Sequence, residues 1–297
     1  MPSSPRRSSR RAPARARRAA VVTGGSSGIG AATVDLLSSK GWNVVACARS
    51  RDALARVAQR CAGRAGRVVT VTADVADADA VARVARVAIE ELGGFDAWVN
   101  NAALLAYGRF EDLPAEAFRR VVDVNLFGYA NGMRCALEHF RGRGQGVVVN
   151  VSSQLGKFAS PHVGAYVTSK FAIQGLSETV RLELGPRSPV RISVVLPGGV
   201  DTPIYRRSAN FSGARASPSY HLQDPRRVAR AVYRCVRRPR REIVVGPSTR
   251  PLALLHAVAP GLYERLGARF GESVQLSDDP APPTDGNLYV ASERVVD

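Results

Sequence analysis

The strongest constraint on the fold is the alternation, along most of the chain, of Val- and Ile-rich runs with segments of helical periodicity. Continuously apolar strands alternating with helices indicate a parallel sheet covered on both faces. Because such crossovers are right-handed, the pattern predicts an α/β fold with a doubly wound parallel sheet of about seven strands. The expected strands are residues 19–25, 42–48, 67–75, 95–102, 146–153, 190–199 and 241–246. The expected helices are residues 29–40, 52–61, 77–92, 114–140 and 160–184, and a segment from Asp224 onward.

The domain organisation follows from where this alternation starts and stops. One large domain is expected over residues 19–248, since 45% hydrophobic residues can supply a sizeable core. Residues 1–18 hold seven arginines and no acid, and they are predicted to be a disordered basic tail. Residues 249–271 are predicted to be a helical extension that could cover a pocket, join a dimer or touch a membrane. Residues 272–297 are predicted to be a polar, extended tail.

The chain is strongly basic, with a formal net charge of +17. Such charge could attract nucleic acid or an anionic membrane, and the Arg- and Ser-rich tail also suits an organelle transit peptide. Basic runs carry no base-reading chemistry of their own, so a solvated tail and helix face are the simpler interpretation. Nucleic-acid binding is therefore not expected, while peripheral membrane contact and organelle import stay open.

The number and spacing of the cysteines indicate the redox state of the cellular compartment. The four cysteines form no CxxC pair, so neither a disulfide framework nor a metal site is expected, and a reducing, cytoplasmic location is predicted. No apolar run approaches the roughly 20 residues that cross a bilayer.

A glycine-rich turn, "TGGSSGIG", lies where the first strand ends and the first helix begins. Gly24, Gly28 and Gly30 follow a GxxxGxG spacing. Glycines let the backbone approach a pyrophosphate closely, and the helix N-terminus presents free N–H groups to it. Tight turning and small-residue packing alone would also explain the glycines, but their place after a buried strand favours dinucleotide binding.

The end of the second strand bears on the choice of dinucleotide. An acidic residue here usually binds the ribose 2′-OH, but this chain reads "ACARSRD". Arg49 could instead clamp a 2′-phosphate. The sequence therefore predicts a preference for NADP(H), with NAD(H) as the alternative.

Taken together, these segments resemble the short-chain dehydrogenase/reductase family, in the branch with a TGxxxGxG turn. The resemblance covers about residues 19–246, and its marks stand in the family's order: "TGGSSGIG", "ADV", "NNAA", "VNLFG", "SSQLG", "YVTSK" and "PGGVDT". The family implies a Rossmann-like, three-layer α/β/α fold and an oxidoreductase activity. One departure is Ala103, because the family usually has glycine at this position and an added methyl could shift the backbone beside the cofactor.

The resemblance also implies roles for individual residues. Tyr166 and Lys170 match the YxxxK pair, Ser153 lies thirteen residues before the tyrosine, and Asn125 matches the asparagine of a proton relay. Substrate contacts are expected at Ser153, Gln154, Leu155 and Tyr166. Cofactor contacts are expected at Gly24, Ser26, Ser27, Gly28, Ile29, Gly30, Arg49, Ser50, Asp74, Val75, Asn101, Ala102, Ala103, Tyr166, Lys170, Pro197, Gly198, Val200 and Thr202.

The Tyr–Lys spacing agrees with this chemistry. A free tyrosine has a pKa of about 10, too high for an efficient base near neutral pH. Tyr166 and Lys170 are four residues apart on a predicted helix and share a face, so the ammonium can favour the phenolate. Lysine stands at only three positions in a chain otherwise rich in arginine, and Lys170 is one of them.

The sequence thus predicts an NADP(H)-dependent carbonyl reductase or alcohol dehydrogenase. Its substrate is expected to be a small, hydrophobic ketone, aldehyde or secondary alcohol, because the pocket should be lined by Leu104, Leu105, Tyr107, Ile204, Tyr205 and Phe211. The long loop at 201–223 is typical of a lid over such a site. Relatives suggest a homodimer or homotetramer. A non-catalytic protein that keeps the fold is the alternative, against which the intact Ser–Tyr–Lys set argues.

Overall fold

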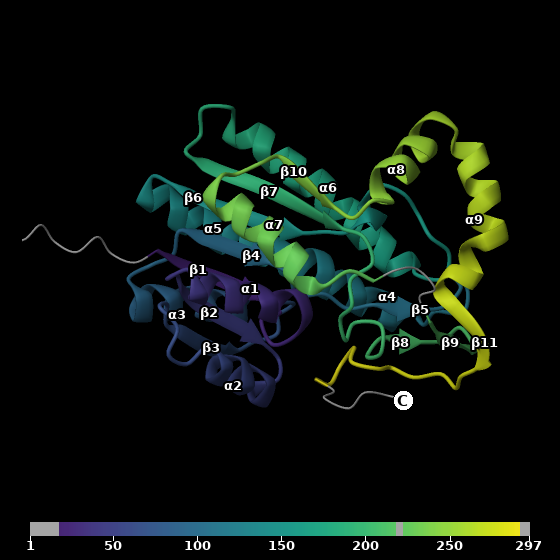
Figure 1. Ribbon diagram of the computed structural model, residues 1–297, viewed down its shortest axis with the longest axis horizontal. Helices are drawn as coiled ribbons and strands as arrows, with labels where there is room; N and C mark the ends of the chain where they lie inside the picture. The colour runs from purple at the N-terminus through teal and green to yellow at the C-terminus, as the bar shows by residue number, and fades with distance from the viewer. Residues whose placement is uncertain (1–17, 218–221, 292–297) are drawn as a thin grey trace, which may run out of the picture.

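The computed structural model describes residues 18–217 and 222–291. Within these ranges one seven-stranded, fully parallel sheet has the order β10-β7-β6-β4-β1-β2-β3 (Figure 1). The predicted α/β fold with a doubly wound sheet is confirmed. The strands are β1 (Ala19–Thr23), β2 (Asn43–Ala48), β3 (Val68–Thr72), β4 (Ala97–Asn100), β6 (Gly146–Val151), β7 (Val190–Pro197) and β10 (Glu242–Val245).

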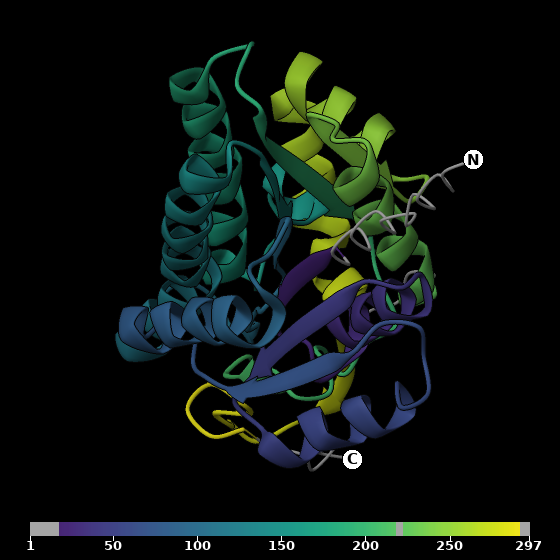
Figure 2. The ribbon, with the colours of Figure 1, turned by 90° about the vertical axis from the view of Figure 1, so that its left-hand side faces the viewer.

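Helices cover both faces of the sheet, as Figure 2 shows in a view along its edge. One face carries α3 (Ala78–Leu92), α5 (Gly128–Arg143) and α6 (Gly164–Leu184), and the other carries α1 (Gly28–Ser39), α2 (Arg51–Arg60) and α7 (Pro225–Arg237). Neighbouring strand residues face opposite layers, so Val21 packs into the first core and Val22 into the second. The tail predicted at 1–18 lies almost wholly outside the described residues.

The helix predicted over 114–140 is interrupted. It consists of α4 (Ala115–Val122), a π-helical segment (Asp123–Phe127) and α5, which ends at Arg143. The π-helical segment contains Asn125, whose buried side chain bonds the main chain of Leu104 instead of solvent. The next helix, predicted from residue 160, begins only at Gly164, after turns at 161–162.

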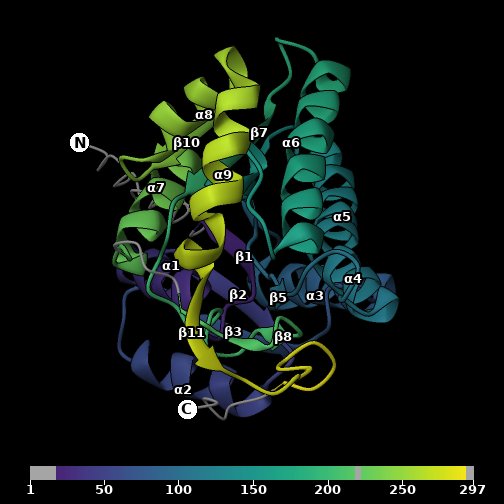
Figure 3. The same cartoon turned by 90° about the vertical axis from the view of Figure 1, so that its right-hand side faces the viewer.

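The loop at 201–223 has more structure than its composition indicates. It contains β8 (Ala209–Asn210), which pairs with β5 (Ala106–Tyr107), and β9 (Ala214–Ala216). Beyond the sheet lie α8 (Thr249–Val258) and α9 (Pro260–Gln275), followed by β11 (Leu276–Pro280), which is antiparallel to β9 (Figure 3).

The predicted boundary between helix and tail at 271 falls short of the end of α9. The helix continues to Gln275, whose side chain donates a 3.0 Å hydrogen bond to Ser160 Oγ. This contact joins residues 115 positions apart, so the local sequence pattern could not place the helix end. None of the helices in the described ranges has the combined length and apolarity needed to cross a bilayer.

Candidate active site

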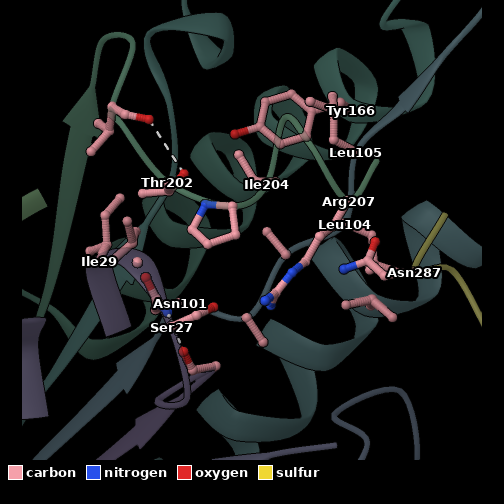
Figure 4. A pocket seen from close by; sticks show the side chains of 18 of the residues that line it. Ser27, Ile29, Asn101, Leu104, Leu105, Tyr166, Thr202, Ile204, Arg207 and Asn287 are labelled. Atoms are coloured by element: carbon pink, nitrogen blue, oxygen red, sulfur yellow. Dashed lines mark hydrogen bonds between the residues drawn. The ribbon is translucent and has the colours of Figure 1, made fainter. Parts of the chain in front are cut away.

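One pocket lies at the carboxyl ends of the central strands, beside the point where the strand order reverses between β1 and β4. Ligands of doubly wound sheets bind at such switch points. In the view of Figure 4, Thr202 and Asn287 enter the pocket from opposite sides, Tyr166 stands above, and Arg207 extends into the cavity.

The glycine turn forms one end of this pocket. A Cβ at Gly24 would lie 2.8 Å from Ala102 Cα, and one at Gly28 would lie 2.9 Å from Thr202 Cγ2. Both glycines have positive φ, which side-chain-bearing residues rarely adopt. Ser27 is the N-cap of α1 and makes no capping hydrogen bond through its side chain. The helix N-terminus therefore presents N–H donors to the pocket, which fits the pyrophosphate of a dinucleotide.

Asn101 connects the turn to the end of β4. Its Nδ2 donates to the carbonyls of Thr23 (3.0 Å) and Gly24 (3.3 Å), while its main-chain N–H donates to Thr23 Oγ1 (2.9 Å). These bonds hold two strand ends against each other at the switch point. Ala103, the departure from the family motif, lines the pocket without a positive φ, so alanine causes no backbone strain there.

The other side of the turn is cationic. Arg49 follows β2 and lines the pocket beside Asp74, whose carboxylate forms an ion pair with Arg120. Burial lowers the pKa of Arg49, the negative charge of Asp74 opposes this effect, and the positive charge of Arg120 adds to it. Arginine stays protonated under all ordinary conditions, so two cations and one carboxylate meet here.

The predicted catalytic residues lie at the opposite end. Ser153 follows β6, while Tyr166 and Lys170 lie on α6, and all three line the pocket. Lys170 is 1% exposed, and its Nζ lies 5.2 Å from the Tyr166 ring centroid and 5.1 Å from that of Tyr129. Its Nζ donates a 3.2 Å hydrogen bond to the carbonyl of Val151.

Burial dominates the ionisation of this pair in the protein alone. It raises the pKa of Tyr166, with a smaller contribution from Tyr205, while a hydrogen bond with Ser153 lowers it. Burial also lowers the pKa of Lys170 to about 7. The hypothesis from the sequence is that Lys170, together with an oxidised nicotinamide, lowers the pKa of the phenol, and it stays a prediction. In the protein alone, burial is the largest contribution to the pKa of Tyr166, and it raises that pKa.

This burial predicts a pH-dependent stability. Between pH 7 and 9 the unfolded chain keeps the Lys170 proton that the folded protein releases, so the free energy of unfolding should rise with pH. Lys170→Met should remove a rise of about 2 kcal/mol across this interval. Urea unfolding at both pH values, without cofactor, measures the difference from wild type. Lys157→Met, which changes a surface lysine, should keep the wild-type rise. Parallel pH profiles for wild type and Lys170→Met would contradict the depressed pKa.

Asn125 is fully buried but does not line the pocket. Its amide receives a hydrogen bond from Leu104 N (2.7 Å) and donates to Leu104 O (2.9 Å) and Ser169 Oγ (3.1 Å). These contacts hold the segment after β4, which lines the pocket, against α6. The relay role implied by the resemblance stays a prediction.

The structure brings nearly all predicted site residues together. Of the predicted cofactor and substrate residues, Gly30 does not line the pocket. It packs against the main chain of the glycine turn, where a Cβ added at Gly30 would lie only 2.1 Å from the carbonyl oxygen of Gly24. Phe211, expected at the substrate end, packs instead against the core. Gln154 lines the pocket, but its Oε1 accepts hydrogen bonds from Ser248 and Thr249.

Arg207 lines the pocket from the loop at 201–223, which was expected to contribute to it. Three lining residues near the C-terminus were not predicted from the sequence: Gln275, Asn287 and Ala291. A local signal was the short apolar run at 288–290 in a mostly polar tail, and Leu288 of this run is fully buried.

A Rossmann-like sheet with a glycine turn at one end of the pocket and a Ser–Tyr–Lys set at the other defines a nicotinamide-dependent oxidoreductase. A family model described as short chain dehydrogenase matches residues 18–211, and the chain belongs to this family. Enzymes of this family exchange hydride between CH–OH groups and NAD(P), and this chain is an oxidoreductase of that class.

Three comparisons illustrate the relationship. The chain is 33% identical over 277 residues to the uncharacterized oxidoreductase YxnA of Bacillus subtilis, covering 91% of this chain and 77% of the relative. A short chain dehydrogenase/reductase from Burkholderia phymatum in complex with NAD superposes with a TM-score of 0.73 at 26% identity, covering 83% of this chain and 95% of that one. An alcohol dehydrogenase from Thermococcus sibiricus complexed with 5-hydroxy-NADP gives 0.66 at 28% identity, covering 77% and 96%.

Proposed function

We propose that the protein is an NADP(H)-dependent carbonyl reductase or alcohol dehydrogenase in which Tyr166 is the general acid and base. The observation that carries this proposal is that Ser153, Tyr166 and Lys170 all line the same pocket, with Lys170 Nζ 5.2 Å from the phenol ring centroid. Nothing in a purely structural role requires three polar groups to converge at a pocket wall.

The residues have separate parts in the reaction. A bound nicotinamide supplies hydride in reduction and accepts it in oxidation. The Ser153 hydroxyl hydrogen-bonds the substrate oxygen and holds it beside Tyr166. The phenol donates its proton to this oxygen in reduction, and the phenolate accepts a proton in oxidation. When Lys170 is protonated, its ammonium favours the phenolate.

The substrate end supports a hydrophobic ketone, aldehyde or secondary alcohol. Few polar groups lie among the side chains that line it. The apolar and aromatic side chains there are Leu104, Leu105, Tyr107, Leu155, Ile204 and Tyr205. Such linings exclude water and bind apolar groups by the hydrophobic effect.

A turnover screen of hydrophobic carbonyls and alcohols, each with NADPH or NADP⁺ and with NADH or NAD⁺, tests the function. Turnover of at least one such substrate by the wild type is expected. If the folded protein binds these cofactors but turns over none of the substrates, the non-catalytic alternative holds.

The NADP(H) preference has its own test at Arg49. Arg49→Ala should weaken NADPH binding roughly thirtyfold, about 2 kcal/mol, because charge-assisted hydrogen bonds to the 2′-phosphate are lost. NADH binding should change less than about threefold, since NADH lacks this phosphate. Isothermal titration with both cofactors measures the two effects. Arg64→Ala, at an exposed ion pair with Asp35, is the control and should change neither. An equal loss for both cofactors would remove the basis for the preference.

Assembly through α5 and α6 into a homodimer or homotetramer is part of the proposal by family analogy. Phe171 and Leu182 on α6 are large apolar side chains exposed on its surface, which is compatible with a subunit contact.

A further inference from the structure

The chain beyond β11 returns to the cofactor end of the pocket. Residues 281–291, here named the C-terminal strap, pass beside β8 in Figure 3. Asn210 and Thr284 exchange main-chain hydrogen bonds of 2.8 and 2.9 Å, and Asn287 N donates to Arg207 O at 2.9 Å. Asn287 and Ala291 of the strap line the same pocket as the glycine turn.

The C-terminal strap is held firmly in this place. Leu288 is fully buried within the same apolar cluster as strand and helix residues of the main core. Gly286 has a φ of +52°, and a Cβ there would lie 2.3 Å from the Ser208 carbonyl oxygen and 2.6 Å from that of Arg207. Only glycine fits such a position without displacing backbone. The strap conformation thus depends on close main-chain packing and a buried side chain.

The strap carbonyls bind Arg49 and Arg120, the two arginines that lie beside Asp74 at the cationic end of the pocket. Arg49 Nη1 donates to Leu288 O at 2.7 Å, and Arg49 Nη2 donates to Asn287 O. Arg120 Nε donates to the same Leu288 oxygen at 2.9 Å, while its Nη2 pairs with Asp74. Two like charges would otherwise repel, so the shared carbonyl and Asp74 hold them side by side.

We propose that the C-terminal strap is part of the cofactor site and orients Arg49 for the 2′-phosphate of NADP(H). This inference rests on the proposed function, and it extends the cofactor site to a segment outside residues 18–211. Asn287 and Ala291 line the pocket together with Arg49 and Asp74, so the strap borders the space that the adenosine end would occupy.

The contacts indicate that the strap supports Arg49 in the cofactor site and does not block the site. The guanidinium has five N–H donors, and the two strap carbonyls use two of them. An arginine already held in one orientation loses less conformational freedom when it binds a phosphate, which strengthens binding. Displacing the strap, in contrast, would expose Leu288 and leave the carbonyl bonds unmade.

The test compares two strap variants with a matched control. One variant ends the chain after Pro283 and removes the Leu288 and Asn287 carbonyls. The second, Gly286→Ala, keeps the full chain and disturbs the strap by the Cβ clash. The control, Gly267→Ala, adds a methyl on α9 where no atom lies within 4 Å. Circular dichroism and thermal melts establish that each variant folds, and Gly286→Ala decides the question if the shortened chain does not.

Isothermal titration with NADPH, NADH and 2′,5′-ADP gives the readout. Both strap variants should bind NADPH and 2′,5′-ADP about tenfold more weakly, with NADH changed less than about threefold, as expected for lost pre-organisation of one charged contact. In an Arg49→Ala background the same strap variants should weaken NADPH less than about threefold, because the two changes act through one side chain. Gly267→Ala should bind all three ligands like wild type.

The opposite results separate the two proposals. Unchanged or tighter NADPH binding by the strap variants, an equal loss for NADH, or a full loss in the Arg49→Ala background would overturn the strap's role while leaving the proposed function intact. A full-length protein that binds neither cofactor would overturn both.

Discussion

Tyr166→Phe is expected to lower kcat by about 1,000-fold or more, while the Kd for NADPH changes less than about twofold. The substitution removes only the hydroxyl that, in the proposed function, exchanges a proton with the substrate oxygen, and it keeps the ring that packs beside Lys170. Cofactor binding should survive because the glycine turn and the cationic end, which lie at the far side of the pocket, are untouched.

Initial rates with saturating NADPH and a substrate from the turnover screen measure this effect, and titration measures NADPH binding. Tyr233→Phe is the matched control, since Tyr233 packs against the second core on α7 and does not line this pocket. If Tyr166→Phe retained more than about a tenth of the activity, the acid–base role would have to be assigned elsewhere.

Lys170→Arg is expected to lower kcat about 100-fold or more, although it conserves the charge. Lys170 is 1% exposed and lies between the Tyr129 and Tyr166 rings, with its Nζ bonded to the Val151 carbonyl. A planar guanidinium is larger and directs its donors differently, so it would strain this packing and move charge away from the phenol.

The pH profile of kcat/KM distinguishes this electrostatic role from a packing role. In the oxidation direction the rate should fall at low pH, where the Tyr166 phenolate becomes protonated. If Lys170 favours the phenolate, Lys170→Arg, which moves the charge away from the phenol, should shift this acidic limb to higher pH. Lys157→Arg, at the surface ion pair with Glu242, should behave as wild type. An unshifted profile with a lower rate would mean that Lys170 only supports the shape of the site.

Much of the site could be predicted from the sequence because its members follow strand ends. Gly24, Asn101 and Ser153 each come within a few residues of a buried strand, and parallel strands bring their carboxyl ends to one edge. Tyr166 and Lys170 share a helix face through their spacing alone. Because these patterns are local, they can be recognised in the sequence without knowledge of the tertiary contacts.

Asn125 and Phe211 show where local patterns fail. Asn125 belongs to a π-helical segment and bonds Leu104, 21 residues earlier in the chain, a contact that no periodicity indicates. Phe211 lies in the predicted lid, but pairing of β8 with β5 turns its segment toward the core. In both cases partners distant in sequence set the orientation of the side chain.

By itself the sequence determined the order of strands and helices along the chain, the position of the glycine turn and the spacing of the Tyr–Lys pair, since each depends on neighbouring residues. Only the tertiary structure placed the C-terminal strap against Arg49. That contact spans 239 positions along the chain and depends on the burial of Leu288, and a leucine in a mostly polar tail carries no local signal for where it will pack.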